Sequence, residues 1–304
     1  MKLSRRQFNH AIGAVAAAAA CSRQSFGFTE NALKLGLNTW SLRALSQEEA
    51  IPVIIQTMKQ ARLQECQLLF THVEPAKFNP VFPAGIFNPP KSSPTPQQLE
   101  EQKATAAALT EWRLSVPMSY FEDIRSTFEK QGLRIKSYSN RFGSSEAEID
   151  RLFLMAKTLG ADSIVTRLPA ASTGMVAAAA DKHRMIVSLQ VSDLDEVKKQ
   201  LASSPYFRMD PDIGDLTKAK IDAVQFVETN YTSMSAFDLK DAMTGGPSVP
   251  FGEGEARIKA VLQFFKDKQV PITAYVDCDY AGTGRSPEEV VKCAAYARSI
   301  IGQA

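Results

Sequence analysis

Hydrophobic residues follow two alternating patterns from residue 33 onward. Short apolar runs of strand length are followed by longer stretches in which apolar positions recur at helical spacing. The short runs predict strands at residues 33–40, 66–70, 133–139, 162–168, 185–190, 206–210, 233–240 and 272–277. The longer stretches predict helices at 47–63, 96–115, 119–132, 145–160, 172–183, 193–203, 217–228, 255–269 and 286–302. A Pro-rich segment at 75–96 predicts a loop.

The eight repeated strand–helix units indicate the fold class. Alternation of this kind is typical of α/β proteins with a parallel sheet. We therefore predict a single (β/α)8 TIM barrel over residues 31–304. An open doubly wound sheet is the alternative, but it would carry a G-x-G-x-x-G turn after the first strand. The chain has GLNTWSLR there instead, so the barrel is the better prediction.

Residues 1–30 have the features of an export signal rather than of the barrel. A basic start with the twin arginine Arg5 and Arg6 precedes an alanine-rich run, as in signals of the Tat pathway. The run is too short and too weakly apolar for a transmembrane span. A frayed N-terminal helix is the alternative interpretation. We expect export by the Tat pathway to the periplasm, with Cys21 as a candidate lipid anchor.

Charge and cysteine content argue against two classes of function. The formal net charge is +2, acidic and basic residues are interspersed, and no basic block with interleaved aromatics follows the N-terminus. Nucleic acid is therefore not an expected partner. Cys66, Cys278 and Cys293 show no C-x-x-C spacing and no histidine nearby, which argues against a zinc site. Both one disulfide and free buried thiols are compatible with the sequence.

Polar side chains follow the predicted strands at their carboxyl ends. In a (β/α)8 barrel these ends form one mouth, where ligands bind and chemistry takes place. The polar residues expected at this mouth are Asn38, Trp40, Arg43, His72, Glu74, Asn140, Arg141, Arg167, Gln190, Ser192, Asp210, Asp212, Asp238, Lys240, Asp277 and Asp279. Carboxylates in this number indicate a metal ion or a polar ligand at the mouth.

Several motifs, in the same order along the chain, resemble one known family. The segments LGLNTWSLR, HVEP, DPDIGDLTKAKID, DLKD and PFGEGEARIKAVLQFFKDKQVPITAYVDCDY are similar to those of the sugar phosphate isomerase/epimerase group, the xylose isomerase-like TIM barrels. The resemblance covers nearly the whole of the predicted barrel and points to an exported branch with Tat signals. It implies a small-molecule carbohydrate partner and one divalent cation, Mn²⁺ or Mg²⁺, held by strands five to eight.

The resemblance also implies roles for individual residues. In the family, two carboxylates near the metal move a proton between adjacent sugar carbons through an enediolate, while the metal polarises the sugar oxygens. The positions that match the family's metal ligands are Gln190, Asp212, Asp238 and Asp277. The expected catalytic residues are Asp277, Lys240 and Glu74, and the expected substrate-binding residues are Trp40, Arg43, His72, Asn140 and Arg167.

Four positions depart from the family pattern. Gln190 stands where a metal-binding glutamate is usual, Asp215 and Asp238 stand where histidines are usual, and Asp277 replaces a glutamate. An amide cannot act as a base, and an all-oxygen ligand set favours Mg²⁺, Ca²⁺ or Mn²⁺ over zinc. Two hypotheses stay open: a metal-assisted isomerase, epimerase or lyase, and a barrel without catalysis that binds a carbohydrate or a partner protein.

The same residues also have purely structural interpretations. Asp212, Asp238 and Asp277 can pair with basic neighbours at the barrel mouth instead of binding a metal. His72 and Glu74 can anchor a loop through a hydrogen bond, and Trp40 can belong to the core instead of stacking on a sugar. The arrangement of these side chains in space decides between the interpretations.

Overall fold

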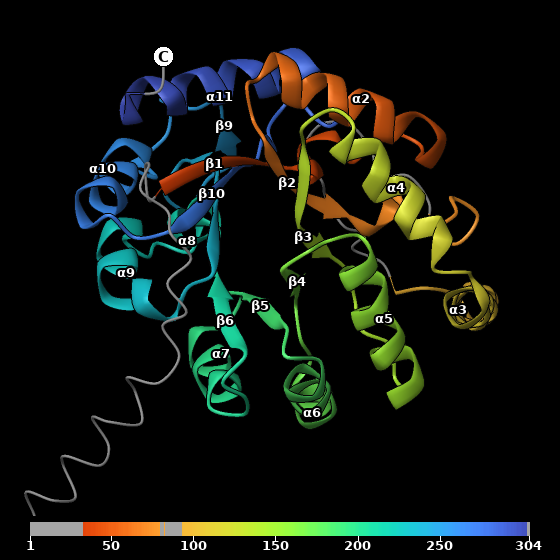
Figure 1. Cartoon of the computed structure of the whole chain (residues 1–304). Helices are drawn as coiled ribbons and strands as arrows, with labels where there is room; N and C mark the ends of the chain where they lie inside the picture. The colour runs from red at the N-terminus through yellow and green to blue at the C-terminus, as the bar shows by residue number, and fades with distance from the viewer. Residues whose placement is uncertain (1–32, 80–81, 83–92, 303–304) are drawn as a thin grey trace, which may run out of the picture.

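The barrel is the dominant feature of the structure. A computed structural model describes residues 33–79, 82 and 93–302, so the expected export signal and Cys21 lie outside the described residues. Eight parallel strands form a nearly closed barrel surrounded by helices (Figure 1). The strands are β1 (Leu33–Asn38), β2 (Glu65–Leu69), β3 (Arg134–Ser139), β4 (Ser163–Thr166), β5 (Ile186–Gln190), β6 (Phe207–Asp210), β7 (Ala236–Leu239) and β10 (Ile272–Val276). The predicted (β/α)8 TIM barrel is confirmed.

The ring of strands is closed least completely between β6 and β7. The strands are hydrogen-bonded in the order β6-β5-β4-β3-β2-β1-β10-β7. Among the described residues, β6 and β7 meet through two isolated bridges, one between Met209 and Met234 and one between Asp212 and Asp238. The amide of Asp238 donates a hydrogen bond of 2.9 Å to the carbonyl of Pro211. Because the eight strands are parallel, their carboxyl ends lie at one mouth of the barrel. The Asp212–Asp238 bridge between β6 and β7 lies at this mouth.

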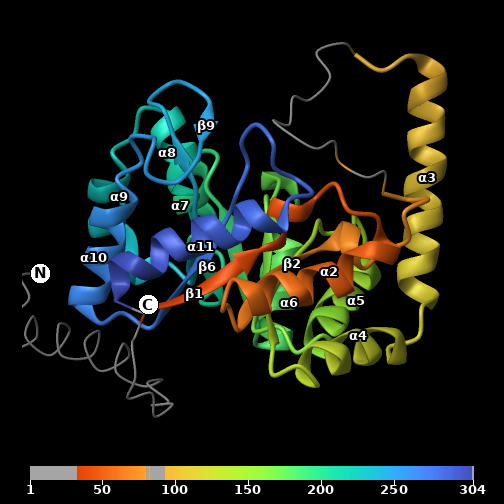
Figure 2. The same cartoon turned by 90° about the horizontal axis from the view of Figure 1, so that it is seen from above.

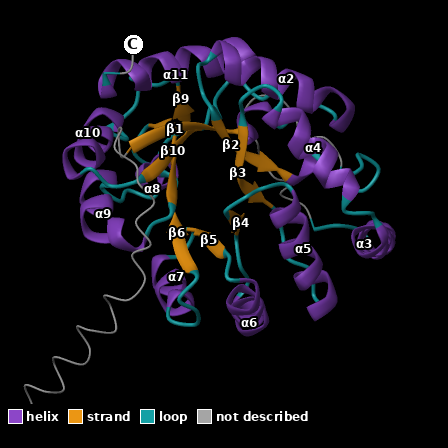
Figure 3. Cartoon of the chain, in the orientation of Figure 1, coloured by secondary structure: helices purple, strands orange, loops and turns teal. Residues whose placement is uncertain are grey.

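Helices cover the outside of the barrel (Figure 3). They are α2 (Gln47–Gln60), α4 (Ser119–Glu129), α5 (Glu146–Thr158), α6 (Thr173–His183), α7 (Leu194–Leu201), α8 (Ile213–Lys218), α9 (Ala223–Asn230), α10 (Ile258–Lys268) and α11 (Pro287–Ile301). Their apolar faces are buried: in α10 the buried residues Ile258, Val261, Leu262 and Phe265 follow the spacing of one helix face. No helix in the described part of the chain is long and apolar enough to cross a membrane.

One long helix, α3 (Pro96–Ser115), lies at the side of the barrel, outside the ring of helices (Figure 2). Thr95 begins it with a capping box, and Pro96 occupies the first turn, where a missing amide hydrogen costs nothing. Most of its side chains are exposed, and Arg113 is its one buried residue. The contacts of Arg113 therefore matter for how α3 is held.

The prediction of one helix over residues 217–228 is wrong, because the chain forms α8 and α9 there. Asp212 caps α8 and Asp222 caps α9, each accepting hydrogen bonds from two backbone amides of the first turn. Between the two helices, Lys220 adopts a left-handed backbone conformation with φ of 63°, which ends α8. α8 therefore begins directly at the barrel mouth, with Asp212 as the capping residue before its first turn.

Candidate functional site

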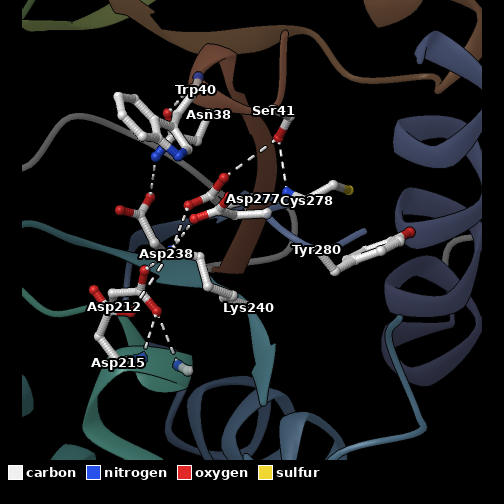
Figure 4. A network of polar contacts seen from close by, with 12 residues as sticks. Asn38, Trp40, Ser41, Asp212, Asp215, Asp238, Lys240, Asp277, Cys278 and Tyr280 are labelled. Atoms are coloured by element: carbon white, nitrogen blue, oxygen red, sulfur yellow. Dashed lines mark hydrogen bonds and ion pairs between the residues drawn. The ribbon is translucent and has the colours of Figure 1, made fainter. Parts of the chain in front are cut away.

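Four aspartates from neighbouring elements meet at the mouth of the barrel. Asp210 ends β6, Asp212 caps α8, Asp238 lies within β7, and Asp277 follows β10 directly. We call these four residues the acid cluster. β7 lies between β6 and β10 in the ring, so the carboxyl ends of the three strands are adjacent. Figure 4 shows Asp212, Asp238 and Asp277 from these three elements around one centre.

Three of the expected metal ligands converge. One carboxylate oxygen from each of Asp212, Asp238 and Asp277 lies within 4.8 Å of the others, a spacing that can hold a metal ion. The fourth expected ligand, Gln190, is the last residue of β5 and pairs with Asp210 across the β5–β6 ladder. The structure therefore places all four expected ligands at adjoining strand ends, with three of them around a shared centre.

A buried lysine ammonium also lies in this centre. Lys240 Nζ is 2.6 Å from Asp212 Oδ2 and 3.1 Å from Asp277 Oδ2. It is 3.8 Å from the nearest oxygens of Asp215 and Asp279, which we call the outer carboxylates. The lysine thus provides one positive charge to the surrounding carboxylates.

Burial and mutual repulsion change the protonation of the acid cluster. Burial raises the pKa of the Asp277 carboxyl to about 7, against the opposing effect of Lys240 and with a further contribution from Asp212. Burial, followed by the charges of Asp210 and Asp277, raises the pKa of Asp238 well above its usual range. For Lys240, burial opposes the charge, but the carboxylates led by Asp212 and Asp277 raise its pKa well above the ordinary value. Lys240 is therefore an ammonium at neutral pH.

Asp210 also belongs to the acid cluster. The sequence predicted its place at the end of a strand but gave it no role as a metal ligand or catalytic residue. Its side chain is buried, and neither carboxylate oxygen has a hydrogen-bond partner among the described residues. Burial, followed by the charge of Asp212, raises the pKa of Asp210 to about 7. The available signal was its position as the last residue of an apolar strand, two residues before Asp212. A buried carboxyl without a hydrogen-bond partner beside three others favours either protonation or a nearby cation.

The substitution Asp210→Asn is expected to stabilise the protein at pH 8 by roughly 1–3 kcal/mol relative to wild type. The pKa of this carboxyl is near the ordinary 3.8 in the unfolded chain, and burial raises it to about 7 in the folded protein. Between these values the folded state binds more protons, so wild-type stability falls as pH rises through this window. An amide does not titrate, so the gain shrinks towards pH 4. Urea unfolding from pH 4 to pH 8 in the presence of chelator measures it.

The matched control for this prediction is Asp267→Asn, on the exposed face of α10. It should leave the pH dependence of the free energy of unfolding unchanged. An Asp210→Asn protein that loses stability with rising pH as steeply as wild type would show that Asp210 is already ionised or already neutralised in the folded protein.

Glu74 and Asn140 belong to a second buried polar group, centred on Arg113. The Glu74 carboxylate accepts hydrogen bonds from Arg113 Nε at 2.8 Å, Asn140 Nδ2 at 2.9 Å and Asn79 Nδ2 at 2.9 Å. Arg113 Nη2 also donates to Asn140 Oδ1 at 2.8 Å. This group joins α3 to the ends of β2 and β3, and these contacts occupy both Glu74 oxygens. They are the contacts of a structural anchor, and the catalytic role expected for Glu74 stays a prediction.

His72 has a separate environment. Its Nε2 lies 3.1 Å from the carbonyl oxygen of Thr39, and its side chain is buried. Burial lowers the pKa of His72 to about 4, against the opposing effect of the hydrogen bond to Thr39, so the imidazole is neutral at pH 7. His72 and Glu74 therefore each anchor a different part of the chain, and no hydrogen bond joins them in the described structure.

Arg43 and Trp40 lie next to the acid cluster. Arg43 is fully buried, and its Nη2 forms an ion pair of 2.7 Å with Asp279, one of the outer carboxylates. The Arg43 guanidinium lies 5.2 Å from the centre of the Trp40 ring, and Trp40 packs against Phe82 at 4.8 Å between ring centres. Asn38 joins this region to the cluster by donating a hydrogen bond of 3.0 Å to Asp238 Oδ1.

Arg167 and Gln190 line a pocket beside the cluster. Its volume is about 230 Å³, and its lining residues are Arg167, Leu168, Pro169, Gln190, Ser192, Asp193, Glu196, Val197 and Gln200. The Arg167 side chain is two-thirds exposed and lies 3.8 Å from Asp215. Gln190 is shared between this pocket and the strand end that carries Asp210. The pocket therefore offers space for a small polar molecule next to the acid cluster.

Known structures share this fold across almost their whole length. A sugar phosphate isomerase/epimerase from Parabacteroides distasonis aligns with a TM-score of 0.59 at 13% identity, covering 92% of this chain and 99% of that one. A xylose isomerase domain protein from Alicyclobacillus acidocaldarius has a TM-score of 0.57 at 13% identity, covering 89% and 99%. D-psicose 3-epimerase, solved in the presence of D-fructose, has a TM-score of 0.59 at 9% identity, covering 88% and 99%.

These neighbours confirm the expected class of protein at the level of the fold. They are sugar phosphate isomerase/epimerase and xylose isomerase-like TIM barrel proteins. No protein-family model matches this chain, and no curated protein matches it. At such low identity the likeness establishes the TIM-barrel fold alone, and the chemistry has to be argued from the residues of the mouth.

Proposed function

We propose that this protein is a sugar isomerase or epimerase that removes a proton from a carbon next to a carbonyl group and returns it to the adjacent carbon or to the other face of the same carbon. The observation that supports this most strongly is the convergence of Asp212, Asp238 and Asp277 around Lys240 at the carboxyl-terminal mouth of the barrel. This is the end of the barrel at which the fold carries out chemistry. Structural neighbours of this fold include an epimerase solved with a ketose present, which supports a small sugar as substrate.

The acid cluster fits a small divalent cation. Its donors are all carboxylate oxygens, the ligands preferred by Mg²⁺ and Mn²⁺. The buried oxygens of Asp210 also lack any hydrogen-bond partner among the described residues, so Lys240 does not pair with every carboxyl group of the cluster. Asp212, Asp238 and Asp277 would hold the ion, with the Gln190 amide oxygen as a further donor. When bound, such an ion polarises the carbonyl and hydroxyl oxygens of a sugar.

The residues of the chain divide the proton transfer between them. Asp277 is the proposed base, because its buried carboxylate directly follows β10 at the mouth, where it can take up and return a carbon-bound proton. Lys240 stays protonated, so it donates a hydrogen bond to a substrate oxygen and does not act as a base. Asn38 holds Asp238 in orientation, and Arg167 lines the pocket that a sugar would enter, while stacking of Trp40 on the sugar stays a prediction.

Carbohydrate binding without turnover is the second candidate function. The observation that favours it is Gln190, because the end of β5 carries an amide and not a second carboxylate base. Epimerisation needs a proton to leave one face of a carbon and return to the other, which is hard for a single base. The two candidates predict the same binding site and differ in whether bound sugar exchanges its carbon-bound hydrogen.

An exchange experiment tests the proposed function. The protein is incubated with Mg²⁺ and a panel of ketohexoses, including D-psicose and D-fructose, in deuterium oxide. Nuclear magnetic resonance then follows deuterium at the carbons beside the carbonyl group and the appearance of an epimer or isomer. Exchange supports the enzyme. Sugar binding without exchange supports the second candidate, and the absence of both from a folded protein contradicts the proposed substrate class.

We also propose that residues 1–30 direct export to the periplasm by the Tat pathway, with Cys21 as a lipid anchor. Changing Arg5 and Arg6 together to lysine keeps the charge but removes the twin arginine that this pathway reads. The variant is expected to accumulate in the cytoplasm, as cell fractionation and immunoblotting would show, while Lys2→Arg is exported normally. A double variant that reaches the periplasm like wild type would refute this route.

A further inference from the structure

We propose that the Lys240 ammonium is an internal counter-ion that competes with a divalent cation for the acid cluster and so sets the cation affinity of the site. This inference rests on the part of the proposed function that places a cation in the cluster. It concerns a different question, namely what holds the carboxylates together when no metal ion is bound.

In Asp212 and Asp277, one carboxylate oxygen accepts hydrogen bonds from neighbouring groups, and the other oxygen forms an ion pair with Lys240. Asp212 Oδ1 accepts the amides of Gly214 at 2.9 Å and Asp215 at 3.0 Å, so the α8 cap occupies it. Asp277 Oδ1 accepts a weaker hydrogen bond from Ser41 Oγ at 3.5 Å. Lys240 Nζ pairs with the other oxygen, Oδ2, of both aspartates. These are the oxygens that a cation between Asp212 and Asp277 would need.

An ammonium and a metal ion cannot share these oxygens favourably. Mg²⁺ requires its oxygen ligands at about 2.0–2.1 Å. An ion seated on Asp212 and Asp277 would therefore lie within a few ångströms of an ammonium that is 2.6 and 3.1 Å from the same two oxygens. Repulsion between like charges at such a distance is strong in a buried site. Cation binding must therefore break the ion pairs of Lys240 with Asp212 and Asp277.

The outer carboxylates provide a second position for the ammonium. Asp215 and Asp279 lie 3.8 Å from Lys240 Nζ, and their side chains are 36% and 16% exposed, compared with 6% for Lys240. A small rotation of the lysine side chain towards them would keep its charge paired while freeing the inner oxygens. The lysine can therefore exchange partners without becoming an isolated buried charge, which would be costly.

Close packing of the lysine stem beside α8 supports a dedicated role for it. A Cβ added at Gly214 would lie 2.8 Å from the Cβ and Cγ atoms of Lys240 and 3.0 Å from its carbonyl oxygen. Only a residue without a side chain allows this approach. The start of α8 therefore contributes the capping residue Asp212 and the close contact between Gly214 and the Lys240 stem. This contact positions the lysine side chain at the cluster.

Binding of Mn²⁺ to full-length variants tests the proposal. Calorimetric titration of wild type, Lys240→Met, Lys240→Arg and Lys218→Met gives their affinities. Lys240→Met is expected to bind Mn²⁺ at least about tenfold more tightly than wild type, because a competing charge has been removed. Lys240→Arg, which keeps the charge, should gain nothing. Lys218 pairs with Asp215 on α8 at 3.1 Å without contacting the inner oxygens, so Lys218→Met should also match wild type.

Thermal unfolding provides a second readout that does not depend on activity. In the presence of chelator, Lys240→Met should unfold at a lower temperature than wild type, because its carboxylates face one another without a cation. Added Mn²⁺ should raise its midpoint by more than that of wild type. If Lys240→Met folds only with Mn²⁺ present, this is the extreme form of the expected result.

Two results would overturn the proposal. One is Mn²⁺ affinity in Lys240→Met within twofold of wild type, or an equal gain in Lys240→Arg. The other is the absence of Mn²⁺ binding from every variant. Neither result decides the proposed function, because sugar exchange in deuterium oxide is measured separately on the wild-type protein. Conversely, a tight Lys240→Met site in a protein without exchange would keep this inference and discard the isomerase.

Discussion

Replacing Asp277 by asparagine is expected to lower kcat for sugar hydrogen exchange by roughly 10²–10⁴-fold, the usual contribution of a positioned acid–base group. An amide of the same shape cannot take up the proton. The protein should stay folded, because the change removes one of several carboxylates that repel one another in a buried site. Exchange rates at saturating sugar, together with unfolding curves of the same preparations, give the measurement.

The control is Asp222→Asn, which makes the same chemical change at the exposed cap of α9. Asparagine is as good a helix cap as aspartate, so both activity and stability should be kept. If Asp277→Asn retains more than about a tenth of the wild-type kcat, Asp277 is not the base that moves the proton.

The substitution Glu74→Ala is expected to lower the free energy of unfolding by about 3–5 kcal/mol, because it leaves the buried Arg113 without its charge partner. The Glu74 side chain is fully buried, and Arg113 Nη2 lies 2.7 Å from it. The Asn140 and Asn79 side chains would lose an acceptor at the same time. Urea unfolding measures the loss, and hydrogen exchange of α3 should increase, since Arg113 is the buried residue of that helix.

Two variants sharpen this test. Glu129→Ala removes an exposed partner of Arg125 on α4 and should cost less than about 1 kcal/mol. Glu74→Gln keeps the shape, so it distinguishes the anchor from the catalytic role expected from the sequence. An anchor predicts lower stability with unchanged kcat for the folded fraction. A catalytic residue predicts a large loss of kcat at nearly unchanged stability.

The alternation of apolar and polar positions was sufficient to predict the barrel, because strand and helix periods are local properties of the chain. The ends of the strands followed from the same pattern, which is why Asp212, Asp238 and Asp277 could be expected at one mouth. The split between α8 and α9 was missed because it depends on the backbone conformation of Lys220, which the hydrophobic pattern does not register.

The partners of the polar residues could not be predicted in the same way. The Asn38–Asp238 hydrogen bond joins residues 200 positions apart, and the Glu74–Arg113 pair depends on where α3 returns to the barrel. Asp210 was visible at a strand end, but only its burial without a partner marks it as part of the site. Sequence patterns identify which side chains reach the mouth, whereas charge pairing among them requires their positions in space.

The bridge between Asp212 and Asp238 is one of the two that join β6 to β7 in the described structure. The same two residues therefore belong to the proposed binding centre and help to close the barrel. A ligand that contacts both side chains would link β6 to β7, the pair of neighbouring strands that is joined least completely in the described barrel. Ligand binding at this centre is therefore coupled to the stability of the β6–β7 contact. Attempts to redesign the chemistry of this mouth will have to reinforce that contact by other means.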